Sequence, residues 1–343
     1  MRYPWVNTIL LMLLIVQLLT GVGGLMSGSE NFRWVLWLHG IGGYTIAILL
    51  SWKGIIIFDV FKRRWYLNLS RLGFIFLTGL VLVILVTGWI WTYMGSTYIA
   101  GFSLIVIHGF LACVLVAFLA WHTLAKWYVW RIPTARNRRV FLRLGSLSLL
   151  GLILRQMAEP AKATANLPGA TRRFTGSYET GNFTGIFPET SWLFDHPLPL
   201  AAESWHLVVE GAIEHPLSLN YLEIEQLATD KHIALLDCTG GFYTIQEWTG
   251  VPLIHLLDLA GVKSTARSVT VEAISGYGRR FPITVARRCL LATQVANKSL
   301  SHGHGFPIRL VVPGYRGYDW VKWVSLIRIN ETSHRWQPPL PLQ

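Results

Sequence analysis

The sequence has few cysteines, little charge overall and almost no acidic residues in its first half. Three of the 343 residues are cysteine (Cys113, Cys238 and Cys289), too few for a disulfide scaffold. Charged residues make up 14% and hydrophobic residues 52%, which is typical of a chain that is partly a membrane protein. Residues 1–157 hold 14 Lys and Arg but only 2 Asp and Glu, whereas residues 158–343 hold 16 of each. The net charge of +12 therefore belongs to the apolar half, and no basic, aromatic-interleaved face indicates nucleic-acid binding.

Long apolar runs dominate the first 125 residues. Each is close to the roughly 20 residues needed to cross a bilayer, and Trp and Tyr stand at their ends, as in interfacial belts. The predicted spans are Trp5–Met26, Trp34–Phe58, Leu72–Tyr93 and Tyr98–Leu124. Basic residues gather near 62–71 and 126–143, which predicts a cytoplasmic N-terminus and two cytoplasmic basic loops.

A paired arginine follows the fourth run. Arg138 and Arg139, followed by Phe141, Leu142 and Arg143, resemble a twin-arginine export signal, which makes the bacterial export machinery a candidate partner. The alternative is a basic stop before an ordinary fifth span that runs to Leu154. Both interpretations place residues after about 158 outside the cytoplasm. Residues 161–165 resemble a signal-peptidase site, and whether this site is cleaved stays open.

The second half of the chain has a mixed α+β pattern. Residues 158–204 are rich in Gly, Pro and Thr, and we expect a linker and an extended arm there. Predicted strands, rich in β-branched residues, are Trp205–Val209, Val269–Ile274, Ile308–Val312 and Val321–Ile329. Predicted helices are Leu219–Leu227 after Ser218, and Val251–Ala260, which has Pro252 in its first turn and Gly261 just past its end. Cys289 falls in a run, Arg287–Val295, that we interpret as a buried helix.

Two histidines in the predicted spans point to a haem. Ionisable groups inside spans indicate function by default, and imidazole is a usual axial ligand of haem iron. His39 and His108 lie about five and ten residues into spans that run in the same direction, so their depths differ by less than ~8 Å. Glycines follow both (Gly40, Gly42, Gly43 and Gly109), leaving room for a flat macrocycle. Hydrogen bonding between helices is the alternative role.

His122 suggests a second haem. It follows His108 by 14 residues, nearly whole helical turns, so the two share a helix face as in two-haem cytochrome b bundles. The residue 14 positions after His39 is Lys53, so a fourth ligand is missing. An interfacial role beside Trp121 is the alternative for His122.

Four motifs in the second half define a resemblance. Cys238 ends a predicted strand in a Gly-containing loop. Trp248–Leu253 (WTGVPL), His304–Gly314 (HGFPIRLVVPG) and Gly317–Trp323 (GYDWVKW) follow. Together these motifs resemble the molybdopterin-binding domain of the sulfite oxidase family, which includes plant nitrate reductases and a periplasmic methionine sulfoxide reductase. The resemblance covers about residues 172–330.

The resemblance implies residue roles. Cys238 matches the thiolate that ligates molybdenum, a soft ligand suited to a transition metal. His304, Arg309, Trp320 and Lys322 match contacts to the pyranopterin and its phosphate, and Ser275 matches a loop near the pterin. Phe187 and Pro188 resemble an arm that closes the site. Tyr243 and Tyr277 are candidate hydrogen-bond donors to a substrate.

Alternatives stay open for this region. A disulfide between Cys238 and Cys289 would explain both cysteines in an exported domain. Sulfite oxidases carry a cation soon after the cysteine, whereas Thr239–Tyr243 has none, which argues against sulfite. Arg279 and Arg280 could supply positive charge from another loop.

We therefore expect a membrane all-α bundle of four to five spans joined to an α+β, strand-rich domain of sulfite-oxidase fold. The expected divisions are 1–130 (bundle), 131–157 (twin-arginine segment and fifth span), 158–204 (linker and arm) and 205–335 (molybdopterin domain, with its arm from about 172). The expected function is a prokaryotic, multi-pass cell-membrane oxidoreductase that moves an oxygen atom to or from a small substrate outside the cytoplasm. Its cofactors would be molybdenum-molybdopterin and haem b, exchanging electrons with the quinone pool in a direction that stays open. The alternatives are a quinol-driven sulfoxide reductase and a non-catalytic anchored binding module.

Overall fold

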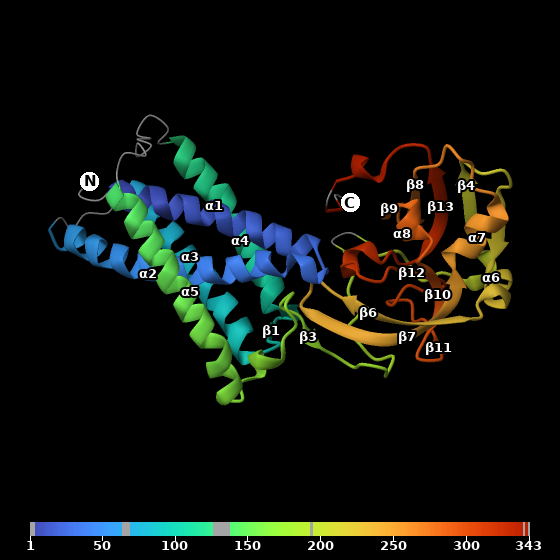
Figure 1. The fold of residues 1–343 in the computed structure, drawn as a ribbon, viewed down its shortest axis with the longest axis horizontal. Coiled ribbons are helices and arrows are strands. Elements are labelled where there is room, and N and C mark those ends of the chain that lie inside the picture. Colours follow the sequence, from blue (N-terminus) through green and yellow to red (C-terminus); the bar gives the residue numbers. More distant parts are fainter. Residues whose placement is uncertain (1–3, 64–68, 126–137, 193–194, 339, 342–343) are drawn as a thin grey trace. The chain divides into compact units, whose positions relative to one another are not determined.

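The computed structural model describes residues 4–63, 69–125, 138–192, 195–338 and 340–341, and its fold is drawn in Figure 1. The chain divides into two compact units. The first comprises Met1–Leu25 and Glu30–Tyr178, and the second comprises Met26–Ser29 and Glu179–Gln343. The basic residues expected in the loop at 126–137 lie outside the described residues.

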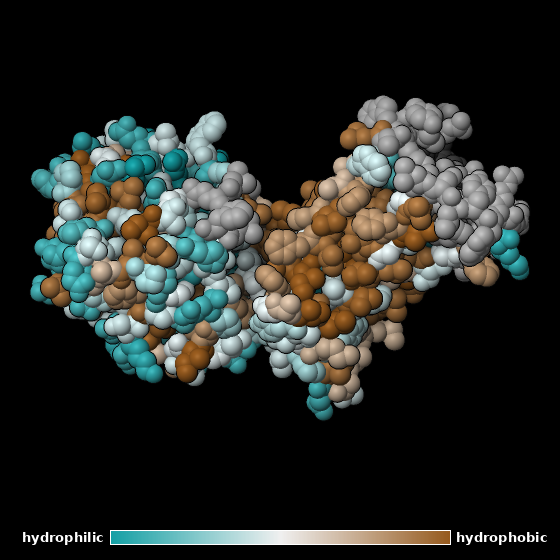
Figure 2. All heavy atoms as spheres, turned by 180° about the vertical axis from the view of Figure 1, so that it is seen from behind, coloured by the Kyte–Doolittle hydropathy of each residue, from teal (hydrophilic) through white to brown (hydrophobic). Residues whose placement is uncertain are grey.

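Five long helices build the first unit. They are α1 (Pro4–Met26), α2 (Arg33–Arg63), α3 (Leu69–Met94), α4 (Leu104–Ala125) and α5 (Arg138–Thr164). All five are long and apolar enough to cross a membrane. Their shared core takes residues from each of α1 to α4, including Ile9, Ile46, Leu80 and Leu115. Many outward side chains are also apolar, and Figure 2 shows hydrophobic residues across the visible face of these helices. Such a surface suits a hydrocarbon solvent better than water.

Two expectations for this unit need correction. The fourth helix begins at Leu104, because Tyr98–Ile99 (β1) and Phe102–Ser103 (β2) pair as a small hairpin across Ala100 and Gly101. Both turn residues have positive φ, which is incompatible with a continuous helix. Helix α5 continues to Thr164, so residues 158–164 are helical and do not belong to a linker. The stretch resembling a signal-peptidase site therefore overlaps the last turn of α5.

The second unit consists of two sheets around one core. One sheet joins β11, β10, β7 and β3, with β12 on β10 and β6 on β7; the other has the order β5-β4-β13-β8-β9. The strands are β3 (Tyr178–Glu179), β4 (His206–Gly211), β5 (Leu217–Asn220), β6 (Asp230–Asp237), β7 (Phe242–Pro252), β8 (Ser268–Ala273), β9 (Gly278–Pro282), β10 (Leu290–Val295), β11 (Lys298–Ser299), β12 (Arg309–Val311) and β13 (Val324–Asn330). The helices are α6 (Tyr221–Leu227), α7 (Leu253–Ala260) and α8 (Ile283–Ala286).

Alternation of apolar and polar residues places the sheets. In β4, Leu207 and Val209 are fully buried, whereas His206 and Val208 are exposed. The same core contains Trp248 from β7 and Ile327 from β13, so residues of both sheets share it. Burial of each such side chain stabilises the fold by roughly 1.5–3 kcal/mol relative to exposure. This core holds the ends of β6, β7 and β12 in place, and the candidate site is built from those ends.

Most predicted elements of this unit are found, with four corrections. Helix α7 ends at Ala260, just before Gly261, whose φ is 68°, as predicted, but it begins at Leu253 because Val251 and Pro252 pair with β10 as the end of β7. Helix α6 begins later than predicted, because residues 217–220 pair with β4 and Asn220 caps the helix instead of Ser218. Residues 321–323 precede β13 and are not part of it. Cys289 is followed by strand β10 and does not lie in a helix, although it is buried as expected.

Candidate functional site

Cys238 lies directly after β6, in the tight turn that leads to β7. Its main-chain N–H donates to Phe242 O, and Gly241 N–H donates back to Cys238 O. The sulfur accepts from Gly240 N–H at 3.3 Å and lies 3.4 Å from Thr190 Oγ1. The side chain is buried at 8% exposure. The turn thus holds the sulfur in one position, with a main-chain N–H directed at it.

The two cysteines of the second unit are independent. Both are among the described residues and neither is in a disulfide, so the disulfide alternative is wrong for this structure. Cys289 Sγ donates to Val285 O at 3.4 Å, and burial raises the pKa of Cys289 to about 12. Cys289 is therefore a core thiol.

A buried ion pair fixes the end of β6. Arg316 Nη1 donates to Asp237 Oδ1 at 2.6 Å, and both side chains are almost fully buried. The next residue, Gly317, packs so closely that an added Cβ would lie 3.1 Å from Cys238 Cα. The sequence did not predict this ion pair, because neither residue carries a sequence signal that points to the other. It positions the loop at Gly314–Gly317 against the cysteine.

Arg309 lies at the start of β12, fully buried beside two indoles. Its guanidinium carbon is 5.2 Å from the centre of the Trp248 ring and 5.9 Å from that of the Trp320 ring. Nη1 donates to His304 O at 3.0 Å. Burial lowers the pKa of Arg309 to about 10, so the side chain stays charged at neutral pH. A buried cation of this kind calls for a nearby anion.

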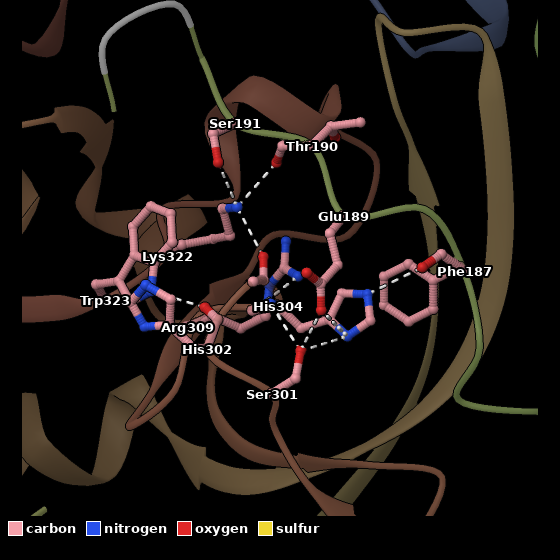
Figure 3. Close-up of polar contacts among 11 residues, drawn as sticks. Phe187, Glu189, Thr190, Ser191, Ser301, His302, His304, Arg309, Lys322 and Trp323 are labelled. Carbon is pink, nitrogen blue, oxygen red and sulfur yellow. Dashed lines mark hydrogen bonds and ion pairs between the residues drawn. The ribbon is translucent and has the colours of Figure 1, made fainter. Parts of the chain in front are cut away.

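Lys322 provides a second buried cation (Figure 3). Its ammonium donates to Thr190 O at 2.8 Å, to Ser191 Oγ at 2.9 Å and to Gly303 O at 2.8 Å. Burial, together with the charge of Arg309, lowers the pKa of Lys322 to about 7. A Cys238 thiolate favours the charged form of both cations, so the sulfur and the two cations lie within electrostatic range.

His304 joins the arm at Phe187–Ser191 to the loop at 301–304 (Figure 3). Its Nε2 is 3.1 Å from Phe187 O, and its ring centre is 4.0 Å from that of the Phe187 ring. A carbonyl only accepts, so Nε2 carries a proton. Nδ1 lies 3.1 Å from Ser301 Oγ, which donates to Glu189 Oε1 at 2.5 Å. Burial and Arg309 lower the pKa of His304, which favours the neutral imidazole.

Several buried polar atoms near these residues lack a hydrogen-bond partner among the described residues. They are Arg309 Nε, Arg316 Nε, Trp320 Nε1 and His302 Nδ1. Because unsatisfied buried groups cost free energy, they suggest a ligand with several acceptors and at least one donor. A pyranopterin with a phosphate has both, so the residues present fit that group.

Two predicted site residues have other partners, and a third lies next to the cysteine. The Tyr277 hydroxyl donates to Tyr318 O, so it is occupied by the main chain. Ser275 Oγ donates to Asp195 Oδ1 at 2.5 Å. Tyr243 lies half-buried on β7 opposite Asp237, one residue from the cysteine along the ladder. The structure thus brings Cys238, His304, Arg309, Trp320 and Lys322 into one network and commits Tyr277 and Ser275 to structural contacts.

The two predicted haem ligands lie side by side in the first unit. The ring centres of His39 on α2 and His108 on α4 are 6.2 Å apart, with an interplanar angle of 72°. Two metal–imidazole bonds of about 2 Å each separate the ligating nitrogens by about 4 Å, so ring centres about 6 Å apart suit one metal ion between them. Gly21 and Gly88 adjoin the rings: an added Cβ would lie 3.3 Å from His39 Cε1 and 3.2 Å from His108 Cε1.

Hydrogen bonds fix the tautomer of both rings. His108 Nδ1 is 3.0 Å from Ile84 O, an acceptor, so Nδ1 carries the proton. His39 Nδ1 is 3.0 Å from Thr20 Oγ1, whose own proton goes to Val16 O at 2.7 Å. Thr20 therefore accepts from Nδ1. Both Nε2 atoms then keep a lone pair, as metal ligation requires.

His122 occupies a different place on α4. It lines an apolar pocket with Leu72, Gly73, Phe76, Leu77, Phe118 and Trp121, and no second histidine is among these described lining residues. It lies 14 residues from His108, about 21 Å along the helix. The glycines expected to leave room for a macrocycle also differ: Gly42 faces Gln17, and Gly109 adjoins open space, while Gly21 and Gly88 border the rings.

Part of the second unit is similar to known proteins. Residues 195–337 match the family model described as oxidoreductase molybdopterin binding domain. The uncharacterized oxidoreductase YuiH of Bacillus subtilis (strain 168) is 28% identical over 133 residues, 38% of this chain and 67% of that protein. The NADH nitrate reductase of Cichorium intybus is 28% identical over 170 residues (39% of this chain, 18% of that protein), and that of Spinacia oleracea is 27% identical over 176 residues (40% and 19%).

The similarity covers only part of this chain and part of most of the proteins that it matches. The match spans less than a fifth of either nitrate reductase. Among solved structures, the sulfane dehydrogenase SoxCD from Paracoccus pantotrophus is 29% identical, with 39% of this chain and 40% of that chain covered and a TM-score of 0.38. The sequence-based prediction of the enzyme class is confirmed for this region: residues 195–337 form a molybdopterin-binding oxidoreductase domain.

Proposed function

We propose that this chain is a membrane-anchored oxidoreductase that uses a molybdenum cofactor at Cys238 and a b-type haem between His39 and His108. A small substrate gives or receives an oxygen atom outside the cytoplasm, and the electrons pass by way of the haem to or from quinone. The observation that carries the proposal is the position of Cys238: a buried sulfur at the end of β6, within electrostatic range of Arg309 and Lys322, inside the matched domain.

The residues around Cys238 would divide the work of binding. When bound, the molybdenum cofactor supplies two-electron oxygen-atom transfer. Cys238 would hold the metal through its thiolate, a soft ligand. Arg309 and Lys322 would bind the cofactor's phosphate, and Trp320 Nε1 and Arg309 Nε would donate the hydrogen bonds that they lack among the described residues. The Phe187–Ser191 arm, tied down by His304 and Lys322, would exclude water from the metal.

The haem proposal is supported by the paired imidazoles. Both Nε2 atoms keep lone pairs, and glycines of α1 and α3 allow the two rings to pack closely against those helices. No group of three or more metal-ligating side chains occurs among the described residues. A haem needs only two axial ligands from the protein, because the macrocycle supplies four. A second haem at His122 would need a second ligand, and no other histidine is among the described residues that line its pocket. We therefore propose a single haem.

Five apolar helices and the distribution of basic residues support a cell-membrane location with the second unit outside. The paired arginines at the start of α5 support a prokaryotic protein exported by the twin-arginine machinery.

The charges near the site favour a neutral substrate. Arg279, considered above as a source of positive charge, is buried and donates to Asp319 at 2.8 Å. Arg280 donates to Thr270 at 3.1 Å and to Thr332 at 3.2 Å. Arg316 is paired with Asp237. With these cations engaged, quinol-driven reduction of a neutral sulfoxide is a better second candidate than sulfite oxidation.

Purified full-length protein tests the proposal. Wild type should contain molybdenum and a b-type haem spectrum; Cys238→Ser should lose the molybdenum and keep the haem, whereas His108→Ala should do the reverse. Turnover of a sulfoxide with quinol, but of no substrate with quinone, would select the reductase. A wild type from cofactor-replete cells with less than about a tenth of a molybdenum per chain would support the non-catalytic module instead.

A further inference from the structure

A cluster of three cations around one carboxylate lies near the end of α5. Glu159 accepts from Arg155 Nη1 at 3.1 Å and from Arg172 Nη2 at 3.4 Å, and its Oε2 lies 2.8 Å from Lys162 Nζ. Arg172 also donates to Thr92 Oγ1 at 3.1 Å. Among the described residues, the ion pairs of these three cations all go to Glu159. The cluster therefore carries an excess of two positive charges.

The excess charge is largely buried. The Lys162 side chain is fully buried and those of Arg155 and Arg172 are less than a fifth exposed. Arg155 Nε makes no hydrogen bond to a described group, and the ammonium of Lys162 is ion-paired with Glu159 at 2.8 Å. Buried, uncompensated cations are costly, most of all beside a membrane interior. An anion with about two negative charges would neutralise this excess.

Arg155, on helix α5, lies next to one of the two histidines. Arg155 crosses α2 at Gly40, where an added Cβ would lie 2.9 Å from Nη1 and 3.1 Å from Cδ. Gly40 directly follows His39. Gly151, one turn before Arg155, packs equally closely on α2: an added Cβ would lie 2.3 Å from Thr45 Oγ1. The glycine after His39 therefore admits a guanidinium, a different role from admitting the macrocycle.

We propose that Arg155, Lys162 and Arg172 bind the two propionate groups of the haem held by His39 and His108. This inference rests on the proposed haem. Two propionates carry two negative charges, which balance the excess of the cluster. Arginine pairs well with carboxylates, and an ammonium has three N–H donors, of which the ion pair of Lys162 with Glu159 uses one. A quinone headgroup is neutral and would leave the excess charge in place. A phospholipid phosphate shares the anionic chemistry and is distinguished below.

Redox titration of the full-length protein in detergent tests the proposal. Loss of a cation beside the haem stabilises the ferric form. In Arg155→Met and Lys162→Met, the ratio of ferric to ferrous haem at a fixed potential should rise roughly tenfold, a fall of about 59 mV for one electron. Arg155→Lys and Lys162→Arg should restore most of the potential. Lys53→Met is the matched control: it removes a cation from α2 about 21 Å along the helix from His39 and should change nothing.

The outcomes separate this inference from the proposed function. A wild type without a b-type haem would overturn the haem proposal itself. If the wild type holds haem, and Arg155→Met, Lys162→Met and Lys53→Met all have the same haem potential as the wild type, only the propionate site is overturned. If the Met variants fail to fold, the charge-conserving pair decides: both must hold haem at close to the wild-type potential.

Esterified haem separates propionates from lipid phosphate. Full-length protein made in haem-deficient cells is titrated with haem b or with its dimethyl ester, which lacks both charges. The wild type should bind the ester at least tenfold more weakly than haem. In Arg155→Met this difference in affinity should be much smaller, because the arginine and the propionates contribute to binding through each other. Equal binding of both forms by the wild type, with phospholipid retained at one per chain, would assign the cations to a lipid and overturn the proposal.

Discussion

Lys322 donates a 2.8 Å hydrogen bond to the carbonyl oxygen of Thr190, whose hydroxyl lies 3.4 Å from the sulfur of Cys238. One residue of the arm thus contacts both a phosphate-binding candidate and the metal-binding candidate. The two are 84 positions apart in the sequence, and Thr190 is 48 positions from the cysteine. The site therefore depends on the arm being in place.

Replacing Lys322 should weaken retention of the cofactor. A hydrogen bond to a charged group contributes about 1.5–3 kcal/mol, so Lys322→Met should bind molybdopterin roughly 10- to 150-fold more weakly. The measurement is pterin fluorescence per chain after dialysis of the full-length protein. Lys231→Met is the control, because Lys231 is half-exposed and paired with Glu247. Equal pterin retention in both variants would exclude Lys322 from the site.

The lowered pKa of Lys322 predicts a pH dependence. Without cofactor, the folded protein holds this lysine with a pKa of about 7, against 10.5 in the unfolded chain. The unfolded chain binds more protons between these values, so this lysine makes stability rise with pH from about 7 to 10. An anion would raise the pKa, so binding should take up a proton and tighten as pH falls from 8 to 6.

Cofactor-free protein titrated with inorganic sulfate, a dianion that does not itself titrate between pH 6 and 8, checks this prediction. Calorimetry in two buffers of different ionisation enthalpy should show proton uptake near pH 7.5 in wild type and less in Lys322→Met. Sulfate binding whose change in affinity between pH 6 and pH 8 is the same in wild type and Lys322→Met would show that Lys322 does not bind the anion.

The pair between Asp237 and Arg316 should be important for stability. Removal of one partner leaves a buried charge uncompensated, which costs about 3–5 kcal/mol. Arg316→Leu should therefore lower the free energy of unfolding of the second unit by that amount and loosen the loop beside Cys238. Denaturant unfolding of the full-length protein in micelles measures the change. Arg328→Leu breaks an exposed pair with Glu210 and should cost less than about 1 kcal/mol.

Thr20 should strengthen haem binding although it is not itself a haem ligand. Its hydroxyl accepts from His39 Nδ1, and loss of such an outer partner typically lowers metal affinity 10- to 100-fold. Thr20→Val should therefore lose haem on dilution faster than wild type. Thr78→Val removes a hydroxyl that only bonds within α3 and serves as the control. If the two variants release haem at the same rate, the imidazole of His39 is not oriented by Thr20.

The sequence predicted the elements with clear end signals and missed those decided by distant contacts. Gly261 marked the end of α7 correctly, whereas its start was predicted two residues too early, because pairing with β10 keeps Val251 and Pro252 in β7. The run at Arg287–Val295 was interpreted as a helix because a short apolar run has no distinguishing period, and pairing with β7 and β12 makes it a strand. Tyr98–Ser103 was counted as part of a span because its side chains are apolar, although Ala100 and Gly101 turn the chain.

The candidate site was predicted only where a contiguous motif exists. Cys238, Arg309 and Lys322 stand in such motifs, and the network brings them together. Glu189, Thr190 and Ser191 carry no motif, and their contacts with Ser301 and Lys322 span more than a hundred residues. Helical depth predicted the pairing of His39 with His108, whereas the adjoining Gly21 and Gly88 come from other helices and gave no local signal.

X-ray absorption at the molybdenum edge of the purified full-length protein tests the central claim most directly. If the Cys238 thiolate binds the metal, the wild type should show one more sulfur neighbour than the cofactor's dithiolene supplies, and Cys238→Ser, where molybdenum is retained at all, should show one fewer than wild type. Cys289→Ala should match wild type. The same number of sulfur neighbours in wild type and Cys238→Ser, at equal molybdenum content, would contradict the account.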